Sequence, residues 1–137
     1  MDTGEGGYPD LNTLSGVTTF NAAILEFDFI ATGDSLSFNY SFGSEEYNEY
    51  VGGGVNDTFG LFLDGPGISG PFENESINLA IIPGSGGTPV SINTVNLDSF
   101  EEFYTDNESN SDPNASQMDG LTVLLEAGSV LQCGETY

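Results

Sequence analysis

The stretch SLSFNYSF (35–42) decides the fold class, because its polar and apolar side chains alternate without a break. In a β-strand, Leu36, Phe38, Tyr40 and Phe42 would point to one face, and the serines and the asparagine between them to the other. Eight residues at period two predict a strand with one buried face and one face in water.

The segment before this strand carries the same pattern. The run ILEFDFI (24–30) alternates, and ATGD (31–34) is typical of a turn. Together they predict a hairpin of 24–30 with 35–42. Residues 1–20 are rich in glycine and predict an N-terminal loop, and the chain shows no sustained helical period.

Short strands continue at intervals of roughly ten residues, with turn residues between them. They are expected at 58–64, 76–82, 89–96 and 121–127. This spacing predicts a single all-β domain over 1–137 with its core in 21–137. The architecture expected is an antiparallel β-sandwich or a jelly roll.

The charge balance sets the chemistry. The 137 residues include 22 Asp and Glu but no Lys, Arg or His, for a net charge of −22. No salt bridge between side chains can form, so a buried carboxylate must be protonated, accept hydrogen bonds from backbone N–H groups or bind a cation from solution. Repulsion among the acids opposes compaction unless ions screen it. The sequence therefore predicts a protein that depends on salt or divalent ions.

The same composition excludes several functions. Nucleic acids and anionic membranes attract cationic side chains, which are absent. No apolar run approaches the ~20 residues of a membrane span, so direct membrane insertion is not expected. Met1 is followed by no basic and apolar leader, so we expect a mature or excised segment of a longer protein. No His or Lys is present to activate a nucleophile, and we expect no enzyme.

The acidic, glycine-rich loop at 43–57 is the candidate metal site. Calcium prefers six to eight oxygen ligands in forgiving geometry, whereas magnesium ranks second and zinc lacks its His and Cys ligands. The alternative is a solvated acidic loop, and Tyr47 and Tyr50 are candidate contacts for a sugar. The expected calcium ligands are Glu45, Glu46, Glu49, Asn56 and Asp57.

Two kinds of modification site are visible. Of the glycosylation sequons, Asn74, Asn107 and Asn114 lie in predicted loops and are the best candidates. Cys133 is the only cysteine, and we expect either a small, partly buried side chain or a disulfide to a segment outside this chain.

Longer motifs resemble a known family. The run from Asn21 to Phe72, with its SEEY and NDTFG core, is similar to the choice-of-anchor L domain of bacterial secreted cell-surface proteins, often from Bacteroidetes. INLAIIPG (77–84), MDGLTVLLEA (118–127) and CGETY (133–137) continue the resemblance. It implies export and an extracellular, cell-surface location. Family members usually continue into further strands after the CGETY position, which implies a C-terminal edge that is incomplete here.

These observations predict an extracellular structural or adhesion module stabilised by calcium. Its expected partners are other surface proteins, glycans or copies of itself. One alternative is a filament subunit completed by strands from neighbouring chains. Another is a calcium-dependent carbohydrate-binding module.

Overall fold

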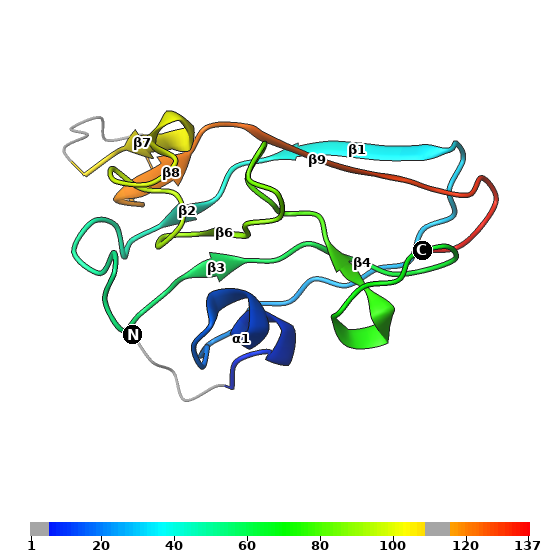
Figure 1. Cartoon of the computed structure of the whole chain (residues 1–137), viewed down its shortest axis with the longest axis horizontal. Coiled ribbons are helices and arrows are strands. Elements are labelled where there is room, and N and C mark those ends of the chain that lie inside the picture. Colours follow the sequence, from blue (N-terminus) through cyan, green and yellow to red (C-terminus); the bar gives the residue numbers. More distant parts are fainter. Residues whose placement is uncertain (1–5, 109–115) are drawn as a thin grey trace.

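The structure is a computed structural model that describes residues 6–108 and 116–137. These residues form short strands, one α-helix and two 3-10 turns (Figure 1). The elements in chain order are α1 (Pro9–Ser15), β1 (Ser35–Tyr40), β2 (Gly43–Ser44), β3 (Thr58–Phe59), β4 (Phe62–Leu63), η1 (Glu73–Glu75), β5 (Ile77–Asn78), β6 (Val90–Ser91), η2 (Glu101–Phe103), β7 (Tyr104–Asp106), β8 (Gly120–Thr122) and β9 (Leu125–Val130).

The described strands pair antiparallel in small sheets. The longest ladder joins β1 to β9, which lie side by side along the molecule in Figure 1. The other sheets have the orders β2-β8-β7, β3-β6 and β4-β5. The mostly β character predicted from the sequence is therefore confirmed, whereas the sandwich or jelly roll stays a prediction.

Strand β1 follows the predicted alternation. Leu36, Phe38 and Tyr40 are half-buried, and the polar residues between them are exposed. Small Ala127 of β9 lies opposite Phe38, so a bulky ring faces a side chain that leaves it room. The apolar face of β1 is thus directed into the molecule, as the pattern predicts.

The predicted hairpin of 24–30 with 35–42 is wrong. The partner of β1 is β9, and over residues 24–30 only Ile30 makes a β-bridge, to Thr136. Strand pairing over such a separation depends on the whole fold, which local alternation does not report. The predicted strands at 76–82 and 89–96 are reduced to two residues each, in β5 and β6. The predicted strand 58–64 is divided into β3 and β4, and 121–127 is divided between β8 and β9, of which β9 continues to Val130.

Helix α1 was not predicted. Its first residue is Pro9. Gly16 follows the last turn with a left-handed φ of 72°, and its N–H donates a hydrogen bond to the carbonyl of Asn12. Proline at the start and glycine after the end are the signals that mark it in the sequence. The buried carboxylate of Asp10 accepts a hydrogen bond from the Glu73 N–H at 3.1 Å, which holds α1 against η1.

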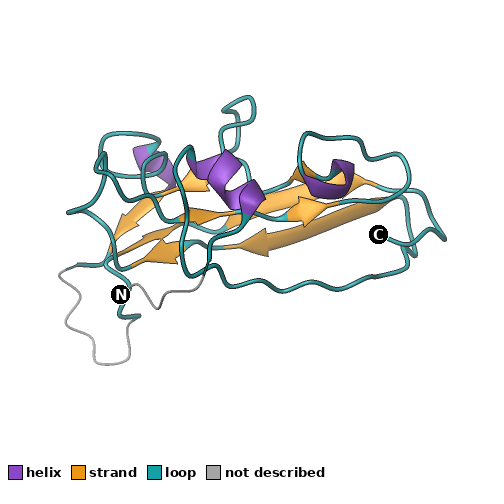
Figure 2. Ribbon diagram, turned by 90° about the horizontal axis from the view of Figure 1, so that it is seen from below, coloured by secondary structure: helices purple, strands orange, loops and turns teal. Residues whose placement is uncertain are grey.

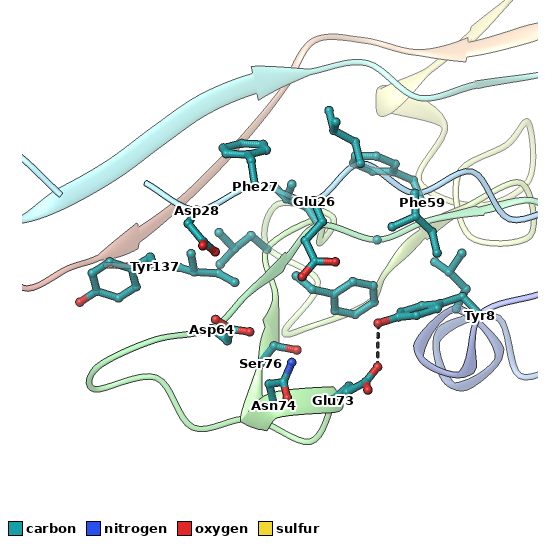
Figure 3. Close-up of a pocket in the computed structure, with 18 of the residues that line it drawn as sticks. Tyr8, Glu26, Phe27, Asp28, Phe59, Asp64, Glu73, Asn74, Ser76 and Tyr137 are labelled. Atoms are coloured by element: carbon teal, nitrogen blue, oxygen red, sulfur yellow. Dashed lines mark hydrogen bonds between the residues drawn. The ribbon is translucent and has the colours of Figure 1, made fainter. Parts of the chain in front are cut away.

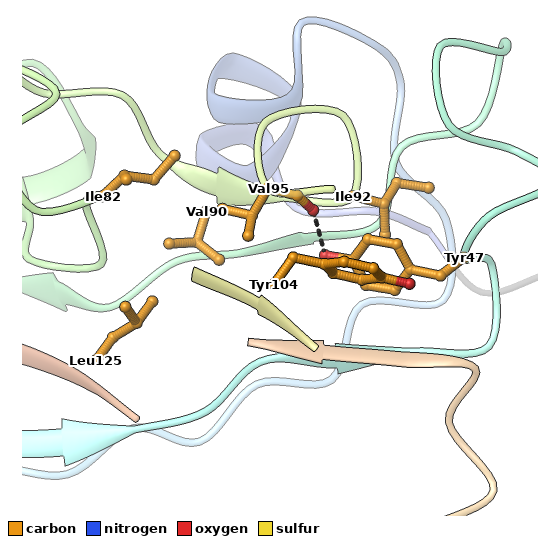
Figure 4. Close-up of a cluster of buried hydrophobic side chains, with 7 residues drawn as sticks. All are labelled: Tyr47, Ile82, Val90, Ile92, Val95, Tyr104 and Leu125. Carbon is orange, nitrogen blue, oxygen red and sulfur yellow. Dashed lines mark hydrogen bonds between the residues drawn. The ribbon is translucent and has the colours of Figure 1, made fainter. Parts of the chain in front are cut away.

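Two groups of buried apolar residues form the core. The first core cluster includes Tyr47, which has no exposed surface and donates its hydroxyl to the Val95 carbonyl at 2.8 Å (Figure 4). Its members are Tyr47, Ile82, Val90, Ile92, Val95, Tyr104 and Leu125. The second core cluster consists of Ala31, Leu63, Leu79, Ala127, Leu131 and Tyr137. Figure 2 shows the helical segments on one side of the strands.

Removing the hydroxyl of Tyr40 is expected to stabilise the protein. Among the described residues, this hydroxyl is the one buried side-chain polar atom without a hydrogen-bond partner, and burial raises the pKa of Tyr40 to about 12. Tyr40→Phe should therefore raise the free energy of unfolding in urea by about 1 kcal/mol. Tyr47→Phe is the matched control and should lower it by about 1–2 kcal/mol, because the buried Val95 carbonyl loses its donor. Equal effects of the two variants would contradict this account.

Candidate functional site

The main cavity is an open groove of about 640 Å³. One wall is the segment 23–29, which follows α1 in the chain and runs toward the C-terminus (Figure 1). The floor comes from Leu36 and Phe38 of β1 and from the segment 58–64, which contains β3 and β4. Figure 3 shows Tyr8 near one end of this groove and Tyr137 near the other.

Apolar side chains line the groove but remain in water. Leu25 is 87% exposed and Phe27 is 70% exposed, although both are in the wall. Phe29, next along the wall, is half-buried and stacks on Tyr137 with 5.9 Å between ring centroids. A contiguous exposed apolar surface of this kind is typical of an interaction site.

Carboxylates border the apolar surface. Glu26, Asp28, Asp64 and Glu73 are all exposed and all line the groove. The Tyr8 hydroxyl donates a hydrogen bond to Glu73 Oε2 at 2.8 Å, and this bond is the largest cause that raises the pKa of Tyr8 to about 12. The groove therefore combines an apolar interior with a negative border, which suits a ligand that is apolar and positively charged.

Alkaline pH is expected to weaken the fold at this end of the groove. The folded-state pKa of Tyr8, about 12, lies above the ordinary value of 10.0. The contribution of the protonated Tyr8 hydroxyl to the stability of the fold is therefore complete below pH 10.0 and is lost as the pH rises through 12. Tyrosinate absorbance of the wild type, compared with Tyr8→Phe, should show one late-titrating tyrosine missing in the variant. An unchanged titration curve would contradict the assignment.

Comparison with protein families gives a match along the entire chain. The family model described as the choice-of-anchor L domain matches residues 1–137. The chain belongs to the choice-of-anchor L domain family. Comparisons with curated proteins and with solved structures give no significant match.

The family points to a module of a cell-surface or secreted protein. No helix in the described part of this choice-of-anchor L domain has the length and apolar character needed to cross a membrane.

The acidic loop of the domain is tied down by hydrogen bonds. Ser44 Oγ donates to Asp57 Oδ2 at 2.7 Å, and Asn56 Nδ2 donates to the Ser15 carbonyl at 3.1 Å. Glu45 and Glu49 are exposed, and Glu46 is half-buried. Within residues 6–108 and 116–137, no three His, Cys, Asp or Glu side chains converge as a metal site. Calcium binding by Glu45, Glu46, Glu49, Asn56 and Asp57 stays a prediction.

The two tyrosines of this loop differ in position. Tyr47 is fully buried in the first core cluster, so its ring has no surface to offer a sugar and the expected contact is corrected to a packing role. Tyr50 is 47% exposed and remains accessible. Tyr47 therefore anchors the loop in the core, and a sugar contact by Tyr50 stays a prediction.

The candidate modification sites also differ. Asn74 is exposed in η1, whereas Asn107 donates its side-chain amide to the carbonyls of Ser116 and Met118 at 3.0 and 2.7 Å. Asn114 lies outside the described residues. Cys133 is exposed and pairs with no other cysteine of this chain. Of Asn74 and Asn107, Asn74 is therefore the one whose side-chain nitrogen a glycosylating enzyme would reach more easily.

The groove itself was missed by sequence reasoning. Its wall residues Leu25, Phe27 and Phe29 belong to the segment that was predicted to pair with 35–42 in a hairpin. The sequence carries the alternation that makes a strand but no sign of which strand is its neighbour. Only the structure shows that Leu25 and Phe27 remain exposed and that Phe29 is half-buried.

Proposed function

We propose that this domain is a non-enzymatic binding and structural module that works outside the cell as part of a surface protein. Membership in the choice-of-anchor L family carries the proposal, because that match covers residues 1–137. The groove supports a role in binding, since an apolar surface with a negative border is suited to recognition. The proposal includes stabilisation by calcium, supported by 22 acids without a single Lys, Arg or His.

Labelling of intact cells tests the location. The protein would carry an epitope tag in its source organism and be labelled with an antibody, before and after the cells are permeabilised. We expect full labelling of intact cells and no labelling of a tagged intracellular control. Labelling that appears only after permeabilisation would overturn the proposed function.

A second candidate is a subunit of an extracellular filament. Within the described part of the chain, no hydrogen bond involves the backbone of residues 23–28. This edge favours the candidate, because a neighbour's strand could complete it. Each copy brings a charge of −22, so assembly would require divalent ions between copies. Sedimentation with calcium at high protein concentration should then show oligomers, and monomers alone would contradict this candidate.

Carbohydrate binding retains only Tyr50 of its two expected contacts.

A further inference from the structure

An unpaired backbone edge borders the groove. Phe29 and Tyr137 exchange two hydrogen bonds, from Phe29 N–H to the Tyr137 carbonyl at 2.8 Å and from Tyr137 N–H to the Phe29 carbonyl at 2.9 Å. The Ala31 N–H bonds to the Glu135 carbonyl at 2.9 Å in the same short antiparallel ladder. Residues 23–28 continue the line of Phe29, yet no hydrogen bond joins them to any other described residue. An exposed edge of this kind is a template for pairing with another strand.

The pairing of Phe29 with Tyr137 determines which backbone N–H and C=O groups of residues 23–28 are free to bind another strand. Every second residue of an antiparallel strand directs its N–H and C=O groups to the same side. Leu25 and Phe27 therefore direct theirs to the side on which Phe29 meets Tyr137, and Glu26 and Asp28 direct theirs away. A strand added in line with 135–137 would exchange backbone hydrogen bonds with Leu25 and Phe27.

The side chains of residues 23–28 determine which side chains an added strand should carry on each of its faces. Residues directly opposite each other in an antiparallel pair lie on the same face of the sheet. Positions opposite Leu25 and Phe27 would suit apolar side chains, and positions opposite Glu26 and Asp28 would suit cationic ones. The groove offers apolar surface from Phe59 and other floor residues, and this surface remains available to the added side chains.

Charge distinguishes a second copy of this chain from a cationic strand as the occupant. Glu26, Asp28, Asp64 and Glu73 line the groove, and the chain contains no cationic side chain. A second copy would therefore bring like charge to a border that is already negative, which costs free energy. A strand that carries Lys or Arg has the opposite charge.

We propose that residues 23–28 bind a β-strand of a separate polypeptide, antiparallel to this segment and in line with 135–137, with apolar side chains alternating with Lys or Arg. The proposal rests on the proposed function and adds the chemical class of the partner. Strand addition supplies affinity through main-chain hydrogen bonds, and the alternating side chains supply specificity.

Synthetic peptides test this inference directly. The probe is a labelled peptide of roughly seven residues in which Val and Lys alternate, a typical strand length. One control has the same composition with the valines and lysines in two blocks, and the other has Glu in place of Lys. We expect the alternating Lys peptide to bind the 137-residue chain at least about tenfold more tightly than either control, with an affinity that falls as salt rises.

Two further measurements locate the peptide. Amide hydrogen exchange should slow at Leu25 and Phe27 when the peptide binds, but not at Glu26 and Asp28. Phe27→Ser should weaken binding about tenfold, since a large apolar contact is lost. Val130→Ser is the matched control, because Val130 is 79% exposed on β9 and does not line the groove, and it should leave binding unchanged.

Several results would overturn the proposal. Equal binding of the block peptide would mean attraction by charge alone, and protection of Glu26 and Asp28 would mean a different edge. Self-association that Phe27→Ser abolishes would identify a second copy as the occupant. Protection of Leu25 and Phe27 in the intact source protein without a partner would place a strand of the same polypeptide there. Lack of peptide binding with surface labelling retained would reject this inference and leave the proposed function standing.

Discussion

Replacing Gly120 with alanine is expected to destabilise the fold by about 3 kcal/mol, at the upper end of the usual cost of overpacking a core. Gly120 is buried in β8, between β2 and β7. A Cβ atom there would lie 2.6 Å from the Tyr104 ring and 2.6 Å from the Tyr47 ring. These rings already touch, with centroids 4.9 Å apart, so neither can move away without disturbing the first core cluster.

Gly33→Ala is the matched control for this substitution. No atom lies within 4 Å of a Cβ built on Gly33, and its φ lies outside the left-handed region. The free energy of unfolding of the Gly33→Ala variant should stay within about 0.5 kcal/mol of the wild-type value. Urea denaturation of both variants measures the difference, and a Gly120→Ala protein as stable as Gly33→Ala would show that the two rings pack differently.

Local patterns carried the information on strands. The alternation in 35–42 predicted β1 and the face it buries, because that alternation depends only on neighbouring residues. The same type of pattern in 24–30 predicted a strand, but among the described residues only Phe29 and Ile30 of this segment pair, with Tyr137 and Thr136, because pairing requires a partner from elsewhere in the chain. Helix α1 was overlooked because seven residues are too few to show a helical period.

The candidate sites were less predictable for a related reason. Exposure is a property of the packed molecule, so Tyr47 and Tyr50, three positions apart in one loop, end up in the core and at the surface. The groove draws its lining from Tyr8 to Tyr137, and no short window of sequence contains it. Composition, in contrast, is a global property, and the absence of Lys, Arg and His is known before any fold is described.

That absence also links the groove to the stability of the chain. The acids that would attract a cationic strand are part of the same excess of negative charge that opposes folding. A cationic partner would relieve repulsion at Glu26 and Asp28 as it binds, so the bound domain should be more stable than the free one. Under these two proposals, metal ions and a partner strand would be alternative sources of the positive charge that the sequence lacks.

Transfer to metal-free buffer of low ionic strength is expected to lower the melting temperature by about 10 °C or more, a loss of a few kcal/mol for a chain of this size. Reducing the salt from ~0.1 M to ~0.01 M lengthens the Debye length from about 10 to about 30 Å, so that acids across the whole molecule repel one another. Calcium should restore the melting temperature more fully than NaCl at equal ionic strength if it occupies a site. Thermal melts followed by circular dichroism measure both effects.

Two double variants separate bound calcium from general screening, because each removes two exposed acids from a different place. Glu45→Gln with Glu49→Gln alters the loop proposed to bind calcium, and Glu101→Gln with Glu102→Gln alters η2 by the same charge. Both pairs should raise stability slightly at low salt, because both reduce repulsion. Only the first should abolish the advantage of calcium over NaCl, since carboxylate ligands are what calcium requires. Equal responses of the two double variants would mean that calcium acts only by screening. A melting temperature of the wild type that is unaffected by chelator and low salt would mean that the fold does not depend on ions.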